Sequence, residues 1–275
     1  MEPNKVLKKL RKERNISQSE LASKISTRNT LGSYEHGGTS INYYILRQYL
    51  AKLNVSVEEF DFLTATDIKE YKKVISTKLK HLYYHHNYND LIALLNEIKS
   101  KYETSHDFYY LHLDAQYRFV LFKEGIIHLD KKEIDFFTNE IKKYLDKIET
   151  WGQFESSVFI NTMHIFDTTY VLQTIEYIHK KNIFYSTLYK KYQILEKMHL
   201  NALYLLSERK EFHLVPIILN SFKKTIDDDD LKNKVIISFF DGFIEKNESK
   251  KNKALQVLRT FDMHMHADYL ASLYQ

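Results

Sequence analysis

The chain has 275 residues, 28% of them charged, and a formal net charge of +4, which is long enough for one small and one medium domain, each with its own core. It contains no cysteine, which excludes a disulfide framework, a thiolate nucleophile and a cysteine-ligated zinc site and is expected of a protein in the reducing cytoplasm. Two prolines and six glycines are too few for the turns of a strand-rich fold, and no run approaches the roughly 18 apolar residues that span a bilayer, so we expect an all-α protein that does not enter a membrane.

The first 65 residues are predicted to form a domain of five short helices. Ser17 begins a capping-box pattern, S-x-x-E, at the start of the second helix. Thr27 is expected to cap the third helix, Arg28–Glu35, and the pair Gly37-Gly38 to end it. The segment holds ten Lys/Arg against seven Asp/Glu, and such a basic bias on a small domain is typical, although only weakly diagnostic, of nucleic-acid binding.

The second and third helices of this domain have the pattern of a helix-turn-helix. Leu21 and Leu31 are expected in the core, and the small Ala22 where the two helices cross. The first turn of the third helix would then enter the major groove, where Arg can pair with guanine and Asn with adenine, while the free amides that begin the second helix suit a phosphate. The alternative is that Arg28 and Asn29 only solubilise and cap an exposed helix. The predicted DNA contacts are Ser17, Gln18, Arg28, Asn29, Thr30 and Ser33.

Residues 66–275 are predicted to form a second domain of longer amphipathic helices. The expected spans are 67–86, 88–103, 106–124, 130–149, 154–166, 168–181, 185–207, 211–225, 229–246, 248–261 and 264–274. Asp130-x-x-Glu133 is a capping pattern at one of the starts. Short connections between helices, with no strand signal, favour stacked helical pairs with a period near 40 residues, which is a solenoid.

The helix-turn-helix resembles the XRE, or lambda-repressor-like, class, and its turn, one residue shorter than usual, resembles one branch of that class, the Rgg/GadR/MutR regulators of Gram-positive bacteria. The resemblance extends over nearly the whole chain. It is carried by Trp151-Gly152-x-Phe154-Glu155-x-x-x-Phe159-x-Asn161, by Asn201, and by the ending from Phe239-Phe240-x-Gly242 to Tyr269. It implies a lambda-repressor-like five-helix domain followed by a tetratricopeptide-like right-handed helical solenoid, in a homodimeric transcription regulator that binds double-stranded DNA. The ligand implied is a short signalling peptide (quorum sensing), secreted and reimported.

The same resemblance has consequences for single residues of the first domain. It implies that Arg11 forms a structural salt bridge with Glu35 rather than a base contact. Gly32 is a departure from the family pattern, because it lies inside the third helix, where glycine is about 1 kcal/mol less stable than alanine. Ser33 stands where relatives generally carry Arg or Lys, so one phosphate contact is expected to be missing.

An extended peptide exposes main-chain donors and acceptors at every residue, and an asparagine side chain offers one group of each kind. Asn161 and Asn201 are 40 residues apart, about one helical pair, and are expected to face the same groove. His164 follows Asn161 by three residues and Tyr204 follows Asn201 by three, so each shares a helical face with its asparagine. The alternative is that both asparagines cap or bridge neighbouring helices.

The aromatic residues are expected to lie mostly in the core, and Phe108, Phe119, Phe136, Phe166 and Phe261 fall in helical periodicity with Leu and Ile. The excess of tyrosine suits a groove that is partly in contact with water.

Other functions find little support in the sequence. His81 and His85 have the i, i+4 spacing of a zinc pair, but no third ligand is near, so solvated or stacked histidine is the simpler interpretation and no metal or cofactor is expected. No phosphate loop, nucleophile elbow or dinucleotide fingerprint indicates an enzyme. The main competitor is a prophage- or plasmid-type repressor whose helical domain serves dimerisation or a protein partner without a peptide ligand.

Overall fold

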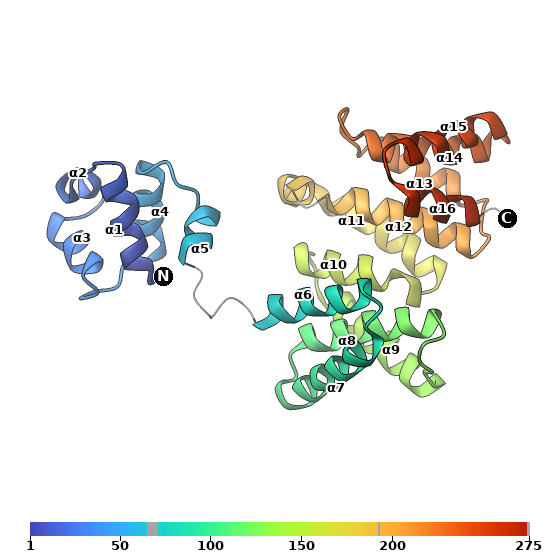
Figure 1. The fold of residues 1–275 in the computed structure, drawn as a ribbon, viewed down its shortest axis with the longest axis horizontal. Coiled ribbons are helices and arrows are strands. Elements are labelled where there is room, and N and C mark those ends of the chain that lie inside the picture. The colour runs from blue at the N-terminus through green and yellow to red at the C-terminus, as the bar shows by residue number, and fades with distance from the viewer. Residues whose placement is uncertain (65–70, 192, 274–275) are drawn as a thin grey trace. The chain divides into compact units, whose positions relative to one another are not determined.

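The computed structural model describes residues 1–64, 71–191 and 193–273, without the side chains of Tyr71 and of residues 181–191. The described residues form helices and no strands, as predicted (Figure 1). They divide into two compact units, Met1–Leu91 and Ile92–Gln275. The domain boundary predicted between residues 65 and 66 lies outside the described residues.

The first 64 residues contain the five predicted helices, which are α1 Pro3–Glu13, α2 Gln18–Ala22, α3 Arg28–Glu35, α4 Tyr43–Lys52 and α5 Val57–Thr64. Their core is formed by fully buried side chains such as Leu7, Leu21, Leu31 and Tyr49. The core includes the two leucines predicted from the sequence.

Local signals fix the ends of α3 as predicted. The Thr27 hydroxyl accepts a hydrogen bond from the Thr30 amide at 3.0 Å. At the other end, the amide of Gly38 donates to the Ser33 carbonyl and that of Gly37 to the Tyr34 carbonyl, both at 2.9 Å. This pair of bonds is a Schellman motif, and Gly37 supplies the positive φ of +79° that the motif requires. At α2 only the serine half of the predicted capping box is formed among the described residues.

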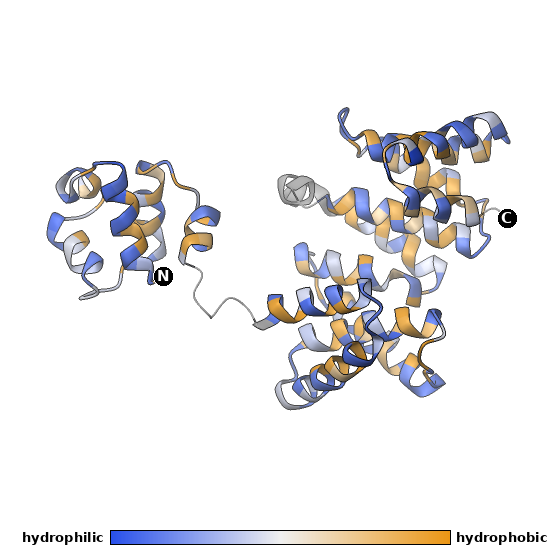
Figure 2. Ribbon diagram, viewed as in Figure 1, coloured by the Kyte–Doolittle hydropathy of each residue, from blue (hydrophilic) through white to orange (hydrophobic). Residues whose placement is uncertain are grey.

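The rest of the chain contains eleven described α-helices and one short 3₁₀ turn. These are α6 Tyr71–Tyr84, α7 Tyr88–Ser105, α8 Phe108–Lys123, α9 Lys131–Lys147, α10 Gln153–Thr162, η1 Met163–Ile165, α11 Thr168–Lys191, α12 Ile194–Glu208, α13 Val215–Lys223, α14 Leu231–Ile244, α15 Glu248–Thr260 and α16 His264–Ser272. From α8 onward they share one core of buried side chains. Hydrophobic residues follow stripes along these helices (Figure 2).

Three details of this array differ from the sequence prediction. The helix expected to end at residue 181 continues to Lys191, because no glycine or proline interrupts it. The helix expected over 154–166 ends at Thr162 and passes into a 3₁₀ turn. Phe136 and Phe261, predicted in the core, are 47% and 71% exposed.

Candidate DNA and peptide sites

The first turn of α3 presents two polar side chains to solvent. Arg28 and Asn29 are both exposed, and neither makes a hydrogen bond within the described chain. Thr30, the third predicted contact in this turn, is half-buried, and its hydroxyl lies 2.8 Å from that of Thr27. The turn therefore offers one guanidinium and one carboxamide whose donors and acceptors are available to base edges.

The side chains predicted to bind phosphate are differently placed. The Ser17 hydroxyl accepts from the Glu20 amide at 3.1 Å. The Gln18 amide nitrogen donates to Glu35 Oε2 at 2.8 Å, so its side chain joins α2 to α3. Ser33 is half-buried on α3. The groups that remain available to bind an anion at the start of α2 are therefore backbone N–H groups.

The predicted salt bridge between Arg11 and Glu35 is present and bidentate. Arg11 Nε and Nη2 donate to the two Glu35 oxygens at 2.6 Å each, and Arg11 Nη1 donates to the Ile16 carbonyl at 2.8 Å. Burial acts to raise the pKa of Glu35, but hydrogen bonds from Arg11 and Gln18 and the charge of Arg11 outweigh it and hold the pKa below its ordinary value. The network joins α1, α2 and α3, and thereby fixes the helix that carries Arg28.

The two asparagines predicted to bind a peptide have different surroundings. Asn161 is exposed on α10, and its amide has no hydrogen-bond partner within the described chain. Asn201 is half-buried on α12, and its Nδ2 donates to the Ile160 carbonyl at 3.2 Å. Asn201 thus bridges neighbouring helices, as the alternative interpretation expected, and keeps its acceptor oxygen and one N–H for a ligand.

The two side chains predicted beside the asparagines carry buried atoms that lack a partner. His164 Nε2 and the Tyr204 hydroxyl are both shielded from solvent without a hydrogen bond in the described chain. Burial lowers the pKa of His164 to about 4, and the nearby charge of Lys123 acts in the same direction. Burial also raises the pKa of Tyr204. Both groups are therefore neutral near pH 7, and each can make one further hydrogen bond.

Three more residues lie around these two, and the sequence did not point to them. Glu208, one turn after Tyr204 on α12, accepts from Lys123 Nζ at 2.7 and 2.8 Å and from the Tyr269 hydroxyl. The rings of Tyr204 and Tyr269 meet edge to face, with centroids 4.9 Å apart. We call Lys123, His164, Tyr204, Glu208 and Tyr269 the Glu208 cluster. It draws side chains from α8, η1, α12 and α16.

A second polar cluster joins α11, α12 and α13. His199 Nε2 lies 2.9 Å from His179 Nε2 and 3.1 Å from the Ser221 hydroxyl, and His199 Nδ1 lies 2.7 Å from the Leu195 carbonyl. Burial lowers the pKa of His199 to about 4. The predicted histidine pair on α6 is in contact, with the His81 and His85 rings tilted by 48° and their centroids 4.2 Å apart. Among the described residues, no group of three His, Cys, Asp or Glu is arranged to hold a metal ion.

Comparison with known families identifies the class of protein. Residues 91–275 match the C-terminal domain of the HTH-type transcriptional regulator Rgg, and residues 7–60 match a helix-turn-helix family. The chain belongs to the Rgg family of helix-turn-helix transcriptional regulators. In the part of this regulator that the structure describes, none of the helices has the length and apolar character needed to cross a membrane.

Solved structures share the fold of this Rgg-family chain over almost its full length. The SHP pheromone receptor Rgg2 of Streptococcus dysgalactiae is 17% identical, with a TM-score of 0.75 over 99% of this chain and 98% of that one. A putative transcriptional regulator from Listeria monocytogenes EGD-e is 15% identical, with a TM-score of 0.77 over 98% and 95%. Bacillus thuringiensis PlcR, in complex with the peptide PapR7 and DNA, is 17% identical, with a TM-score of 0.61 over 98% of each chain. At these identities the similarity establishes the fold.

Proposed function

We propose that this Rgg-family regulator binds operator DNA through α3 and is controlled by a short linear signalling peptide held by Asn161, His164, Asn201 and Tyr204. The observation that supports a peptide ligand is the pair of buried, unpartnered atoms, His164 Nε2 and the Tyr204 hydroxyl. Buried polar groups in folded proteins nearly always have partners, so two exceptions close to one Lys–Glu–Tyr network favour a ligand that supplies them. A peptide main chain carries both N–H and C=O groups and would satisfy both atoms once the side chains that cover them move aside.

The structure of α3 supports DNA recognition by Arg28 and Asn29. Each is expected to lose about 1–3 kcal/mol of specific binding when replaced by alanine, because a paired base edge loses its partner. Lys9→Ala is the matched control, since Lys9 is exposed on α1 and pairs with Glu13 at 3.7 Å on the surface. Gel-shift titrations of an operator fragment at fixed salt test this. If Arg28→Ala and Asn29→Ala both bind like the wild type, the groove-facing turn lies elsewhere.

The peptide site is tested by calorimetric titration of candidate short peptides encoded beside the gene. Asn161→Ala is the cleaner variant, because Asn161 makes no hydrogen bond within the described chain, whereas Asn201→Ala also removes the bridge to Ile160. Each is expected to cost about 1–3 kcal/mol of peptide affinity. Asn220→Ala, at an exposed asparagine of α13, is the control.

DNA binding without peptide is expected to be unchanged in these asparagine variants. Equal peptide affinity in all three variants and the wild type would remove the asparagines from the site. If no candidate peptide binds the wild type, the ligand-free repressor becomes the better interpretation.

The proposed regulator acts as a homodimer, since two symmetry-related recognition helices read a pseudo-palindromic operator. We place the interface on the C-terminal helices, where Leu231, Phe261 and Met265 are 69%, 71% and 80% exposed. The first two line a mainly apolar depression of about 330 Å³ between α14 and α15, which Lys232 also lines. Apolar surface of this kind on a soluble protein usually marks an interface.

Light scattering at micromolar concentration is expected to give twice the 33.0 kDa chain mass. Phe261→Asp should give the monomer, while Phe122→Asp, at a less exposed phenylalanine of α8, should not. A wild-type mass near that of one chain would remove the dimer from the proposal.

A further inference from the structure

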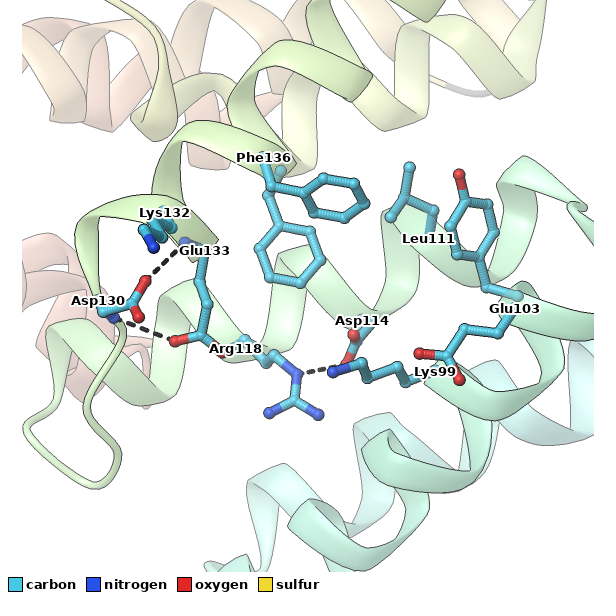
Figure 3. Close-up of a pocket in the computed structure, with 11 residues that line it drawn as sticks. Lys99, Glu103, Leu111, Asp114, Arg118, Asp130, Lys132, Glu133 and Phe136 are labelled. Carbon is cyan, nitrogen blue, oxygen red and sulfur yellow. Dashed lines mark hydrogen bonds and ion pairs between the residues drawn. The ribbon is translucent and has the colours of Figure 1, made fainter.

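A second pocket, which shares no residue with the proposed peptide site, lies between α7, α8 and the start of α9. Its volume is about 250 Å³, comparable with the space that a small organic molecule needs. Figure 3 shows the charged groups of Arg118, Asp114, Lys99 and Glu103 along one side, with Phe136 and Leu111 facing them from the other. The pocket is therefore polar on one wall and apolar on the opposite wall.

The polar wall is built around one buried ion pair. Asp114 is 2% exposed, and its Oδ1 accepts from Arg118 Nε at 2.6 Å. Arg118 Nη2 donates to the Asn96 side chain at 2.9 Å, which leaves Nη1 without a partner in the described chain. Asp114 Oδ2 likewise makes no hydrogen bond there. The ion pair thus presents to the pocket the unused N–H donors of Arg118 Nη1 and one unused acceptor, Asp114 Oδ2.

Further charges of both signs stand beside this pair. Glu103 and Lys99 are exposed on α7, and Lys132 is exposed on α9. Asp130 and Glu133 also line the pocket, but each accepts the other's backbone amide in the capping box that begins α9, at 2.8 and 3.0 Å. The capping box uses one oxygen of each of these two carboxylates, and Asp114 and Glu103 are the pocket carboxylates that take no part in it. The available cations are Arg118, Lys99 and Lys132.

Phe136, which the sequence predicted in the core, is part of the apolar wall of this pocket. Leu111 and Phe137 are buried, Tyr102 is half-buried, and Phe136 remains 47% exposed although it is large and apolar. Covering such a ring with a ligand of matching shape would remove apolar area from water, which is favourable.

We propose that this pocket binds a free α-amino acid with a branched or aromatic side chain. The ligand's ammonium group fits the Asp114 and Glu103 carboxylates, its carboxylate fits Arg118 Nη1 and Lys132, and its side chain fits against Phe136 and Leu111. A purely cationic ligand would bring no anion to Lys99 and Lys132, and a purely anionic one would bring no cation to Glu103. Burial raises the pKa of Asp114 to about 6 against the opposing charges of Arg118 and Lys99, which is consistent with a carboxylate that gains from an added cation.

The first test is calorimetric titration of the full chain with L-leucine and L-phenylalanine. Leucine amide, which lacks the carboxylate, and 4-methylpentanoate, which lacks the amine, are the matched probes. We expect both amino acids to bind, and each truncated probe to bind at least about tenfold more weakly, because a charged group of the site loses its partner. Equal affinity of leucine and either truncated probe would overturn the zwitterion assignment. No heat with either amino acid, together with no thermal stabilisation at millimolar concentration, would overturn the site.

The second test places the ligand in this pocket with variants of exposed residues, which carry little risk of misfolding. Phe136→Ser and Lys132→Gln are expected to weaken amino-acid binding about tenfold. Phe122→Ser, on α8 outside the pocket, and Lys131→Gln, next to Lys132 but not lining it, are the controls. If the controls lose as much affinity as the pocket variants, or neither group loses any, the amino acid binds elsewhere. Peptide titrations in the same variants should be unchanged, so this result is independent of the proposed peptide site.

Discussion

The hydroxyl of Tyr204 permits a test in which stability and binding change in opposite directions. The atom is buried in the ligand-free chain and has no hydrogen-bond partner among the described residues. Tyr204→Phe removes only this oxygen and keeps the ring, which packs edge to face on Tyr269. In the free protein the substitution therefore removes a desolvation cost without removing a hydrogen bond.

The magnitudes follow from this environment. An unsatisfied buried hydroxyl costs about 1–3 kcal/mol, so Tyr204→Phe should leave the free energy of unfolding unchanged or raise it by up to about 2 kcal/mol. In the peptide complex the same substitution strands the peptide group that the hydroxyl would pair with. Peptide affinity is therefore expected to fall by about 10- to 100-fold.

The matched control is Tyr144→Phe, because the Tyr144 hydroxyl donates to Glu155 at 3.0 Å. That variant should lose about 1 kcal/mol of stability and no peptide affinity. Urea denaturation can be followed through Trp151, the single tryptophan, which is buried in the C-terminal unit. The reasoning is refuted if Tyr204→Phe destabilises the free protein as much as Tyr144→Phe does, or if it binds peptide like the wild type.

Two further predictions concern other parts of the chain. Gly32→Ala should slow hydrogen exchange in α3 roughly two- to fivefold, a stabilisation of about 0.5–1 kcal/mol, because the added Cβ meets Gln18 only at ordinary contact distances of 3.5 Å and more. Gly37→Ala is the control and should speed the exchange, because Gly37 has a φ of +79°. Changes of the same sign in both variants would contradict the argument. The C-terminal unit should lose stability on acidification, because the pKa of His164 and of His199 is about 4 in the folded chain against about 6.5 when unfolded. As pH falls below 6.5 the unfolded chain takes up protons first, so the free energy of unfolding falls by about 1 kcal/mol per histidine and pH unit until about pH 4. Denaturation midpoints that stay constant from pH 7.5 to 5 would refute this prediction. His199→Phe should make the midpoints depend less on pH.

Features with a local cause could be predicted from the sequence. A capping residue acts on amides two or three positions away, so Thr27 and the Asp130–Glu133 pair could be identified without the fold. The bond between Arg11 and Glu35 spans 24 residues and came from the resemblance to a known class. The three-residue spacing from Asn161 and Asn201 pointed to His164 and Tyr204, which prove to carry unpartnered buried atoms.

Features that depend on distant packing could not be predicted. Lys123 and Glu208 are 85 residues apart, and Glu208 and Tyr269 are 61 apart, so no spacing rule joins them. Phe136 and Phe261 have the periodicity of core residues, but their exposure depends on which neighbouring helix covers them. Periodicity identifies the apolar face of a helix, and only the packed array shows whether that face is covered.

The placement of the unpartnered atoms also limits how the proposed peptide could regulate. A ligand shifts an equilibrium only by its difference in affinity for two states, so merely satisfying His164 and Tyr204 equally in both states would have no effect. Glu208 is a group beside this pair that already joins separate helices, since it accepts from Lys123 on α8 and from Tyr269 on α16. A peptide donor that bonds to Glu208 would replace the hydrogen bond from Lys123 or the one from Tyr269. The peptide would therefore bind most tightly to an arrangement in which α8 or α16 has moved. Regulation and affinity are then separable: Tyr204→Phe should weaken binding, whereas Tyr269→Phe should bring the free protein closer to the peptide-bound arrangement.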